Sequence, residues 1–329
     1  MSRLKLGSKG QVGIQFNWMF VLIAGGVILA FFVGFIAMQK DSSNVALETT
    51  IAVDLDASFT GARVSSGTAT KVPFPNIEIK VDCSSFRVGS ASRNLENSML
   101  FSPASIKGRN LITWSKSWNY PMKVGNFLYL TTDNIRYIFV CENNCDKIKL
   151  LEAELPKELN KEVCKKNTDC WDNLEDQNNH HVKVITNVEL DNKFKDVFGE
   201  GKYSVFNIKN EELNNEEINI DQDNNELVYA AIFSENKEHY DCMMANAMKK
   251  LKIVSDLSYK RFKDLENLKC VFWSKTKYDL FKGYVIDCMN DFNSCEFSDL
   301  RLNAFDKSDH LTIEGNNNQL RQLSCPVIY

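Results

Sequence analysis

Histidine is scarce in this chain, and the short motifs that usually accompany catalysis are missing. Four histidines occur among 329 residues, namely His180, His181, His239 and His310. None stands in a Gly-x-Ser-x-Gly, His-Glu-x-x-His or phosphate-loop context. The Asn-x-Ser/Thr signal for glycosylation is also missing. These absences place an enzyme below a structural or binding role, and we expect no cofactor.

The chain also lacks a large excess of charge of either sign. Its net charge is -4, and acidic and basic residues are mixed along the chain. No basic stripe follows Lys40, so we expect no nucleic-acid partner. Hydrophobic residues make up 44% and charged residues 25%, which is typical of a folded globular chain.

Charged residues are absent from Trp18 to Met38. At ~1.5 Å rise per residue, a helix of this length covers the ~30 Å hydrocarbon layer of a membrane. Arg3, Lys5 and Lys9 precede the run without an acidic residue among them, which favours a cytoplasmic N-terminus. No second run of this kind occurs. The sequence therefore predicts a single-pass protein of the cell membrane, with its C-terminal domain outside the cell.

The residues before the apolar run resemble a known processing signal. Lys9, Gly10 and Gln11 stand where the class III signal peptide of archaeal type IV pilin-like proteins ends. The resemblance implies cleavage between Gly10 and Gln11 by a prepilin-peptidase-like protease. It further implies assembly with copies of the chain or with other pilin-like proteins, as a subunit or accessory component of a type IV filament or secretion system. Gln15 stands at the fifth mature position, where pilins usually carry Glu.

Two other interpretations stay open. The first is a plain signal anchor that carries an adhesin or sensor head and forms no filament. The second is a membrane-anchored enzyme. Cleavage of the leader separates the pilin-like protein from the plain anchor, whereas an enzyme requires a pocket in which catalytic groups converge.

The predicted fold class is α+β, with one transmembrane helix followed by a mixed α/β extracellular domain that contains disulfides. Leu47, Ile51, Leu55 and Phe59 recur every four residues, which is typical of one face of a helix that ends near Gly61 or Gly67. We expect a leader at 1–10, the transmembrane helix at 11–40, a helical stalk and linker at 41–69, a β-rich part at 70–150 and a mixed part at 151–329.

Within the ectodomain, apolar runs and alternation predict strands at 77–81, 111–114, 127–130, 137–140, 182–186, 203–208, 227–233 and 271–273. Apolar residues at helical spacing predict a long amphipathic helix over 240–268. We expect a short helix near 192–198, helix-permissive sequence at 151–180 and a surface loop at 210–225.

The cysteines all lie on the predicted outer side. There are ten, namely Cys83, Cys141, Cys145, Cys164, Cys170, Cys242, Cys270, Cys288, Cys295 and Cys325. An even number in an exported domain favours disulfides. The spacing suggests three local pairs, which are Cys141 with Cys145, Cys164 with Cys170, and Cys288 with Cys295.

We expect no metal site. Cys141, Cys145, Cys164 and Cys170 with the His180-His181 pair could form a zinc site, but Cys-x-x-Cys is absent and disulfides are favoured. The segment from Asp221 begins like a calcium loop. However, Glu226 replaces the required Gly and Ile232 the required Glu, so this segment is interpreted as an ordinary loop.

Overall fold

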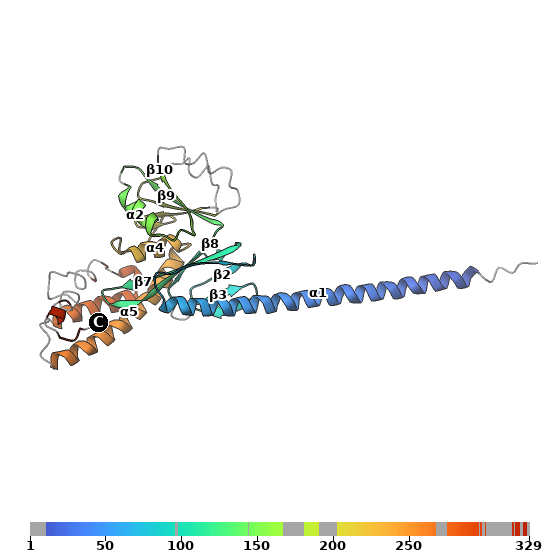
Figure 1. The fold of residues 1–329 in the computed structure, drawn as a ribbon, viewed down its shortest axis with the longest axis horizontal. Helices are drawn as coiled ribbons and strands as arrows, with labels where there is room; N and C mark the ends of the chain where they lie inside the picture. The colour runs from blue at the N-terminus through green and yellow to red at the C-terminus, as the bar shows by residue number, and fades with distance from the viewer. Residues whose placement is uncertain are drawn as a thin grey trace, which may run out of the picture.

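One long helix leads into a head of three β-sheets and several helices (Figure 1). The computed structural model describes residues 11–95, 98–143, 145–166, 181–190, 203–267, 275–295, 297, 300, 318, 320–322 and 325–327. At positions 11–20, 35–42, 265–267 and 275–277 the description is limited to the helical backbone. The described residues thus combine helices, sheets and disulfides, as the sequence predicts for the ectodomain.

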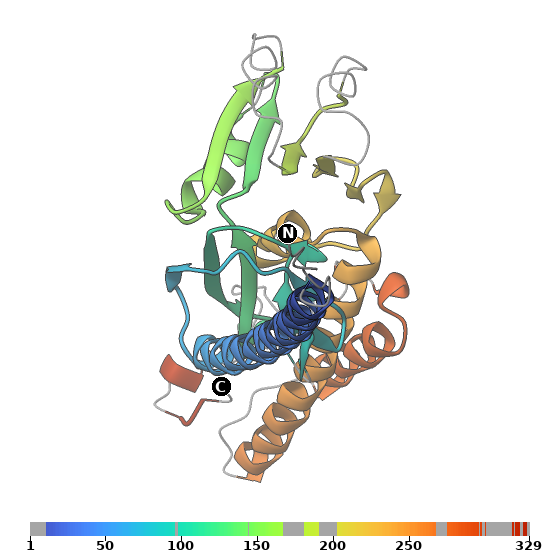
Figure 2. The same ribbon diagram turned by 90° about the vertical axis from the view of Figure 1, so that its right-hand side faces the viewer.

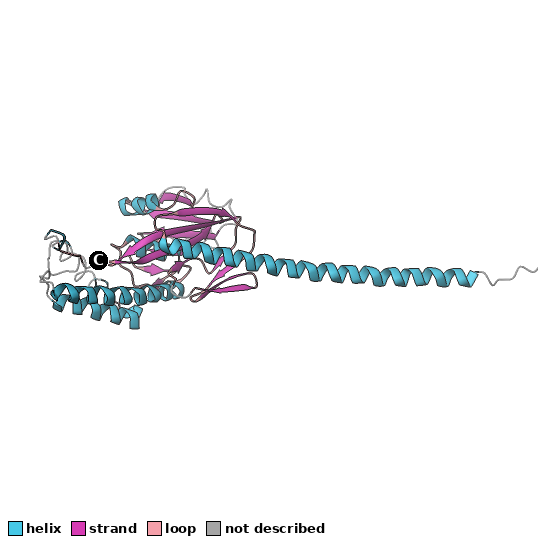
Figure 3. Cartoon of the chain, turned by 60° about the horizontal axis from the view of Figure 1, so that its bottom comes forward, coloured by secondary structure: helices cyan, strands magenta, loops and turns pink. Residues whose placement is uncertain are grey.

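The first helix, α1, runs from Gln11 to Val64 without a break over 54 residues. The predicted helix at 11–40 and the predicted stalk therefore form one element. Its first part extends away from the head, and strands lie beside only its last part (Figures 1 and 3). The chain turns after Val64, and Gly67 adopts a positive φ of 78° that other residues rarely accept.

The predicted membrane-spanning helix is contradicted by the structure. Among the described residues, no helix is long and apolar enough to cross a membrane. The apolar part of α1 whose side chains are described is the stretch 21–34. The predicted fold class is wrong on this point.

Two four-stranded sheets lie beside the last part of α1. The first sheet has the order β1-β7-β8-β5, and the second has the order β4-β3-β2-β6. The strands of the first sheet are β1 (Ala69–Pro73), β7 (Asn110–Asn119), β8 (Lys123–Thr132) and β5 (Leu100–Phe101). Those of the second are β4 (Ala91–Asn94), β3 (Ser85–Val88), β2 (Ile79–Val81) and β6 (Ser105–Ile106). Apart from the parallel β5–β8 pair, these ladders are antiparallel.

The third sheet has six strands in the order β10-β9-β11-β12-β13-β14, and its first four strands are parallel. The strands are β10 (Asn160–Lys165), β9 (Ile135–Cys141), β11 (His181–Thr186), β12 (Tyr203–Asn207), β13 (Glu212–Leu213) and β14 (Glu216–Glu217). Parallel strands are usually buried on both faces, which agrees with the almost continuous burial of β9 and β11.

The described head also contains four helices of nine or more residues and a 3-10 turn. They are α2 (Asp146–Glu154), α4 (Asn225–Phe233), α5 (Lys237–Asn267), α6 (Lys275–Asn290) and η1 (Phe292–Ser294). The predicted helix at 240–268 is confirmed as α5. Three predicted segments lie outside the described residues. They are the helix near 192–198, the strand at 271–273 and the part of 151–180 that follows residue 166.

Residues 227–233 form a helix, so the predicted strand there is wrong. Every residue of this run is at most 1% exposed, because α4 lies in the centre of the main core. The Asn224 side chain caps the helix by accepting a hydrogen bond from the backbone N–H of Leu227 at 3.3 Å. An apolar run buried on all sides carries no periodicity that could separate a helix from a strand.

Candidate assembly interface

The described part of α1 before the head exposes large apolar side chains on all sides. They are Val21, Leu22, Ile23, Val27, Ile28, Leu29, Phe31, Phe32 and Val33, each between 56% and 70% exposed. A helix that is apolar all round is normally buried. An exposed apolar patch of this kind marks an interaction surface.

The helix meets the head at Glu48. Its carboxylate accepts hydrogen bonds from the backbone N–H of Ser90 at 2.8 Å and from the Ser90 hydroxyl at 2.6 Å. These bonds, which favour the charged form, lower the pKa of Glu48. Gly89 has a positive φ of 55°, and a Cβ there would lie 2.2 Å from the Glu48 carboxyl group. A larger residue at Gly89 would be strained by the positive φ and would displace the Glu48 carboxyl group from Ser90.

Beyond Glu48 one face of α1 is buried at the spacing of a helical stripe. Ala52, Leu55 and Phe59 belong to a core cluster with residues of the first and second sheets. The Phe59 ring meets the Phe86 ring of β3 edge to face, with ring centroids 5.3 Å apart. The side-chain amide of Asn126 donates to the Ala62 carbonyl at 3.1 Å near the end of the helix. The head thus holds α1 firmly in one orientation.

A groove runs beside this seated part of α1. Its volume is about 370 Å³, and Leu55 of α1, Val72 and Phe74 of the β1 region, and Leu111 of β7 contribute its apolar lining. β1 is an edge strand of the first sheet. The head thus offers a second, partly apolar surface beside the seated part of α1.

Two of the three predicted sites at the start of the chain lie on α1. Gly10 lies outside the described residues. Gln11 is the first residue of α1, and Gln15 follows one turn later. Their side chains are outside the described part, so the predicted leader cleavage and the role of Gln15 in assembly stay predictions.

Disulfides join three described pairs of cysteines. Cys141–Cys145 and Cys288–Cys295 are two of the local pairs suggested by the sequence. The third pair is Cys83–Cys242, with a sequence separation of 159, and no local pattern could have predicted it. Cys164 and Cys325 are disulfide-bonded as well, and the described residues include no free cysteine. Cys170 and Cys270 lie outside the described residues.

The residues that opened the possible calcium loop have structural roles. Asp221 accepts a hydrogen bond from the Asp223 backbone N–H at 3.1 Å and another from the Tyr120 hydroxyl at 3.3 Å. Asn224 then caps α4. The loop predicted over 210–225 also contains the short β13–β14 hairpin. Within the described part of the chain, no three His, Cys, Asp or Glu side chains are grouped as metal ligands.

The histidines do not form a catalytic constellation in the part of the chain described. His180 and His310 lie outside it. His239 is buried, its Nε2 lies 3.3 Å from the Leu100 carbonyl oxygen, and burial lowers its pKa. His181 begins β11, and burial lowers its pKa as well.

Lys183 is a buried charge that sequence reasoning missed. It lies in the middle of β11 at 3% exposure, and its ammonium group donates to the backbone carbonyl of Ser234 at the end of α4. A cation is favoured there by the negative end of the helix dipole. Desolvation nevertheless lowers the pKa of Lys183 to about 8, although Glu235 acts in the opposite direction.

The depressed pKa of Lys183 predicts a pH-dependent stability. Between pH 8 and pH 10.5 the unfolded chain keeps the lysine proton while the folded chain loses it, so the free energy of unfolding rises with pH. Relative to Lys183→Met, the wild type should gain about 3 kcal/mol between pH 7 and pH 10.5. Urea denaturation of both proteins across this range checks the difference. Parallel pH profiles would contradict the assignment.

Comparison of the sequence and the structure with known proteins identified no relative of this chain. No protein-family model, no curated protein and no solved structure matches this chain. The exposed apolar helix, the groove beside its seated part and the disulfide-bonded head are therefore the features on which a function can be based.

Proposed function

We propose that this chain is a pilin-like subunit or accessory component of a filament or secretion apparatus. In this assembly, the apolar part of α1 is covered by α1 helices of other subunits. The observation that supports the proposal is the all-round exposure of large apolar side chains over 21–34, on a helix whose other half is seated in a folded head. Such a segment needs an apolar cover in the working protein.

Helices of other copies suit this surface for a physical reason. Every copy carries the same protruding helix, so burying one against another removes apolar area from water on both partners. Gly25, Gly26 and Gly34 leave open space where a side chain would stand. Small residues of this kind let two helix backbones approach closely. The head, which stays outside the bundle, would then form the outer surface of the assembly.

Two further features support an exported assembly. The disulfides support folding of the head in an oxidising compartment outside the cytoplasm. The residues around Gly10 and Gln11 resemble a leader that is removed before assembly. Cleavage there would make Gln11, the first residue of α1, the new N-terminus.

A photo-crosslinking amino acid at Leu29 tests the proposal. Leu29 is 68% exposed and lies in the apolar part of α1. Illumination of full-length protein in its native cells should give adducts between two copies, or with another pilin-like chain, as seen by mass. The matched control is the same amino acid at Leu150, which is 55% exposed on α2 of the head. Leu150 should give at most a small fraction of the Leu29 yield.

Three other crosslinking results would count against the proposal. Leu29 adducts with lipid alone, or no adducts at all, would contradict an assembly through α1. Equal yields from Leu29 and Leu150 would show non-specific crowding. A protein that uses its head as a plain adhesin or sensor would give one of these patterns.

A further inference from the structure

The two ends of the head carry opposite charge. Residues 210–236, which include the β13–β14 hairpin and α4, contain eight acidic residues and no lysine or arginine. Residues 249–264, in the second half of α5, contain six lysines and arginines and two aspartates. The chain as a whole has a net charge of only -4. These two segments are therefore opposite in charge, although Lys209 and Lys237 flank the acidic one.

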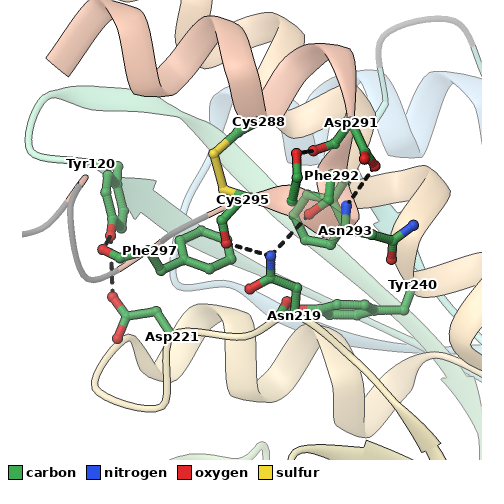
Figure 4. Close-up of a disulfide and its surroundings, with 11 residues drawn as sticks. Tyr120, Asn219, Asp221, Tyr240, Cys288, Asp291, Phe292, Asn293, Cys295 and Phe297 are labelled. Atoms are coloured by element: carbon green, nitrogen blue, oxygen red, sulfur yellow. Dashed lines mark hydrogen bonds between the residues drawn. A yellow bond between two sulfur atoms is a disulfide. The ribbon is translucent and has the colours of Figure 1, made fainter. Parts of the chain in front are cut away.

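The acidic end is a rigid, hollowed surface. Glu216 and Glu217 form β14, the exposed edge strand of the third sheet. Beside them lies a shallow depression of about 620 Å³, lined by Glu211, Glu216, Glu217, Ile218, Asn219, Lys237, Asn293 and Cys295. The side-chain amide of Asn219 donates to the carbonyls of Phe292 at 2.9 Å and Cys295 at 2.5 Å (Figure 4). The Cys288–Cys295 disulfide closes that loop, so the depression is held in shape.

The basic end is a convex helical surface with an apolar centre. Ile253 and Leu257 are 59% and 60% exposed on α5, one turn apart. Lys249 lies one turn before them and Lys260 one turn after them, and Lys260 and Arg261 are exposed. These residues form one stripe along the helix.

Of the two aspartates in this segment, Asp256 is already paired, and Asp264 follows the stripe one turn after Lys260. Asp256 lies 3.0 Å from Lys252 of the same helix and 2.6 Å from Lys282 of α6. Lys263 and Lys282 also lie over the Tyr259 ring, at 4.8 Å and 4.6 Å from its centroid. The stripe therefore keeps a positive potential despite Asp256.

The two charged ends cannot meet within one molecule. Glu216 acts electrostatically on Asp241, and Lys237 lines the acidic depression, so that depression lies beside the first turns of α5. Lys260 follows Lys237 on the same straight helix, about 35 Å further along at ~1.5 Å per residue. Figure 2 shows the far part of α5 pointing away from the third sheet.

We propose that the basic stripe of α5 docks into the acidic depression beside β14 of a second copy of this chain. This proposal rests on the proposed function and adds to it a contact between neighbouring heads. Two different surfaces of one molecule that complement each other produce a heterologous contact, which repeats along a chain of subunits instead of closing into a dimer. Ile253 and Leu257 supply the apolar centre, and the surrounding charges set the orientation.

A charge-swap experiment with a photo-crosslinker at Leu257 tests the contact. One variant carries Lys260→Glu and Arg261→Glu, a second carries Glu216→Lys and Glu217→Lys, and a third carries all four changes. Each of the first two should lower the yield of self-adducts from Leu257 at least about tenfold, because like charges then face each other. The third should restore the yield to within about twofold of the parent.

The matched control is Lys149→Glu with Lys157→Glu, two exposed lysines outside both surfaces. This variant should keep the Leu257 yield within about twofold of the parent. The measurement with a crosslinker at Leu29 is repeated in every variant. Leu29 adducts that persist while Leu257 adducts vanish separate the head contact from assembly through α1.

Three results would overturn the head contact. The Leu257 adducts could survive both two-residue reversals, or the four-residue variant could fail to restore them. Alternatively, the Leu257 yield could fall in the Lys260–Arg261 variant and stay unchanged in the Glu216–Glu217 variant. That result would indicate an acidic partner other than this chain. A loss of Leu29 adducts in the parent, with the Leu257 pattern intact, would contradict the proposed function and leave the head contact standing.

Discussion

Replacing both Cys83 and Cys242 with serine should lower the free energy of unfolding of the head by about 5 kcal/mol. In the chain-entropy account, a disulfide stabilises a protein by restricting the unfolded chain, and its effect grows with the length of the closed loop. Here the sequence separation is 159. The bond joins the turn between β2 and β3 to the first turns of α5, so it ties the second sheet to the main helical core.

The matched control is the double serine variant of Cys141 and Cys145, whose sequence separation is 4. The same account predicts a loss of about 2 kcal/mol for so short a loop. Guanidinium denaturation, followed by the fluorescence of the buried Trp114 and Trp118, measures both variants. An equal loss in the two variants would contradict the dependence on loop length.

Replacing Phe59 with alanine should lower the free energy of unfolding by about 3–5 kcal/mol. It should also weaken the attachment of α1 to the head. Phe59 is 2% exposed and contacts Phe86 edge to face. Its removal leaves a cavity in the cluster that joins α1 to the first and second sheets. Among the described residues, α1 is the only helix in this cluster. No other helix of the cluster can therefore replace the contacts that Phe59 makes with the two sheets.

The control for Phe59→Ala is Phe32→Ala, on the same helix but 56% exposed and outside the head. It should change the free energy of unfolding of the isolated full-length protein by at most about 0.5 kcal/mol. The two variants are compared by denaturation and by proteolysis between Glu48 and Val64. If Phe59→Ala cost less than about 1 kcal/mol and left α1 resistant to protease, α1 would not be held by this cluster.

Local sequence patterns correctly predicted the elements whose apolar residues recur at a regular spacing or form a short run bounded by turn residues. The strands expected at 111–114, 127–130 and 137–140 lie in β7, β8 and β9, and those at 182–186 and 203–208 correspond to β11 and β12. In α5, one apolar face and one polar face alternate at helical spacing over many turns, so a helix was predictable.

Other elements depend on contacts that local sequence does not report. Residues 160–165 lie in a stretch that we expected to be helix-permissive, yet they form β10. Pairing with β9 determines this strand, because six residues of each strand align in parallel. Residues 227–233 form α4 because the core encloses them on all sides. Tertiary packing overrides local propensity in both cases.

By itself, the sequence determined that an apolar helix precedes the head, that the head is a mixed fold, and that its described cysteines form disulfides. Composition and short-range spacing are sufficient for these features, because each depends on neighbours in the chain. Only the tertiary structure decided that α1 is continuous from Gln11 to Val64, that Cys83 meets Cys242, and that Lys183 is buried against α4. It also decided that the acidic segment 210–236 and the basic segment 249–264 lie too far apart to meet within one molecule, since exposure and distance in space are set by packing.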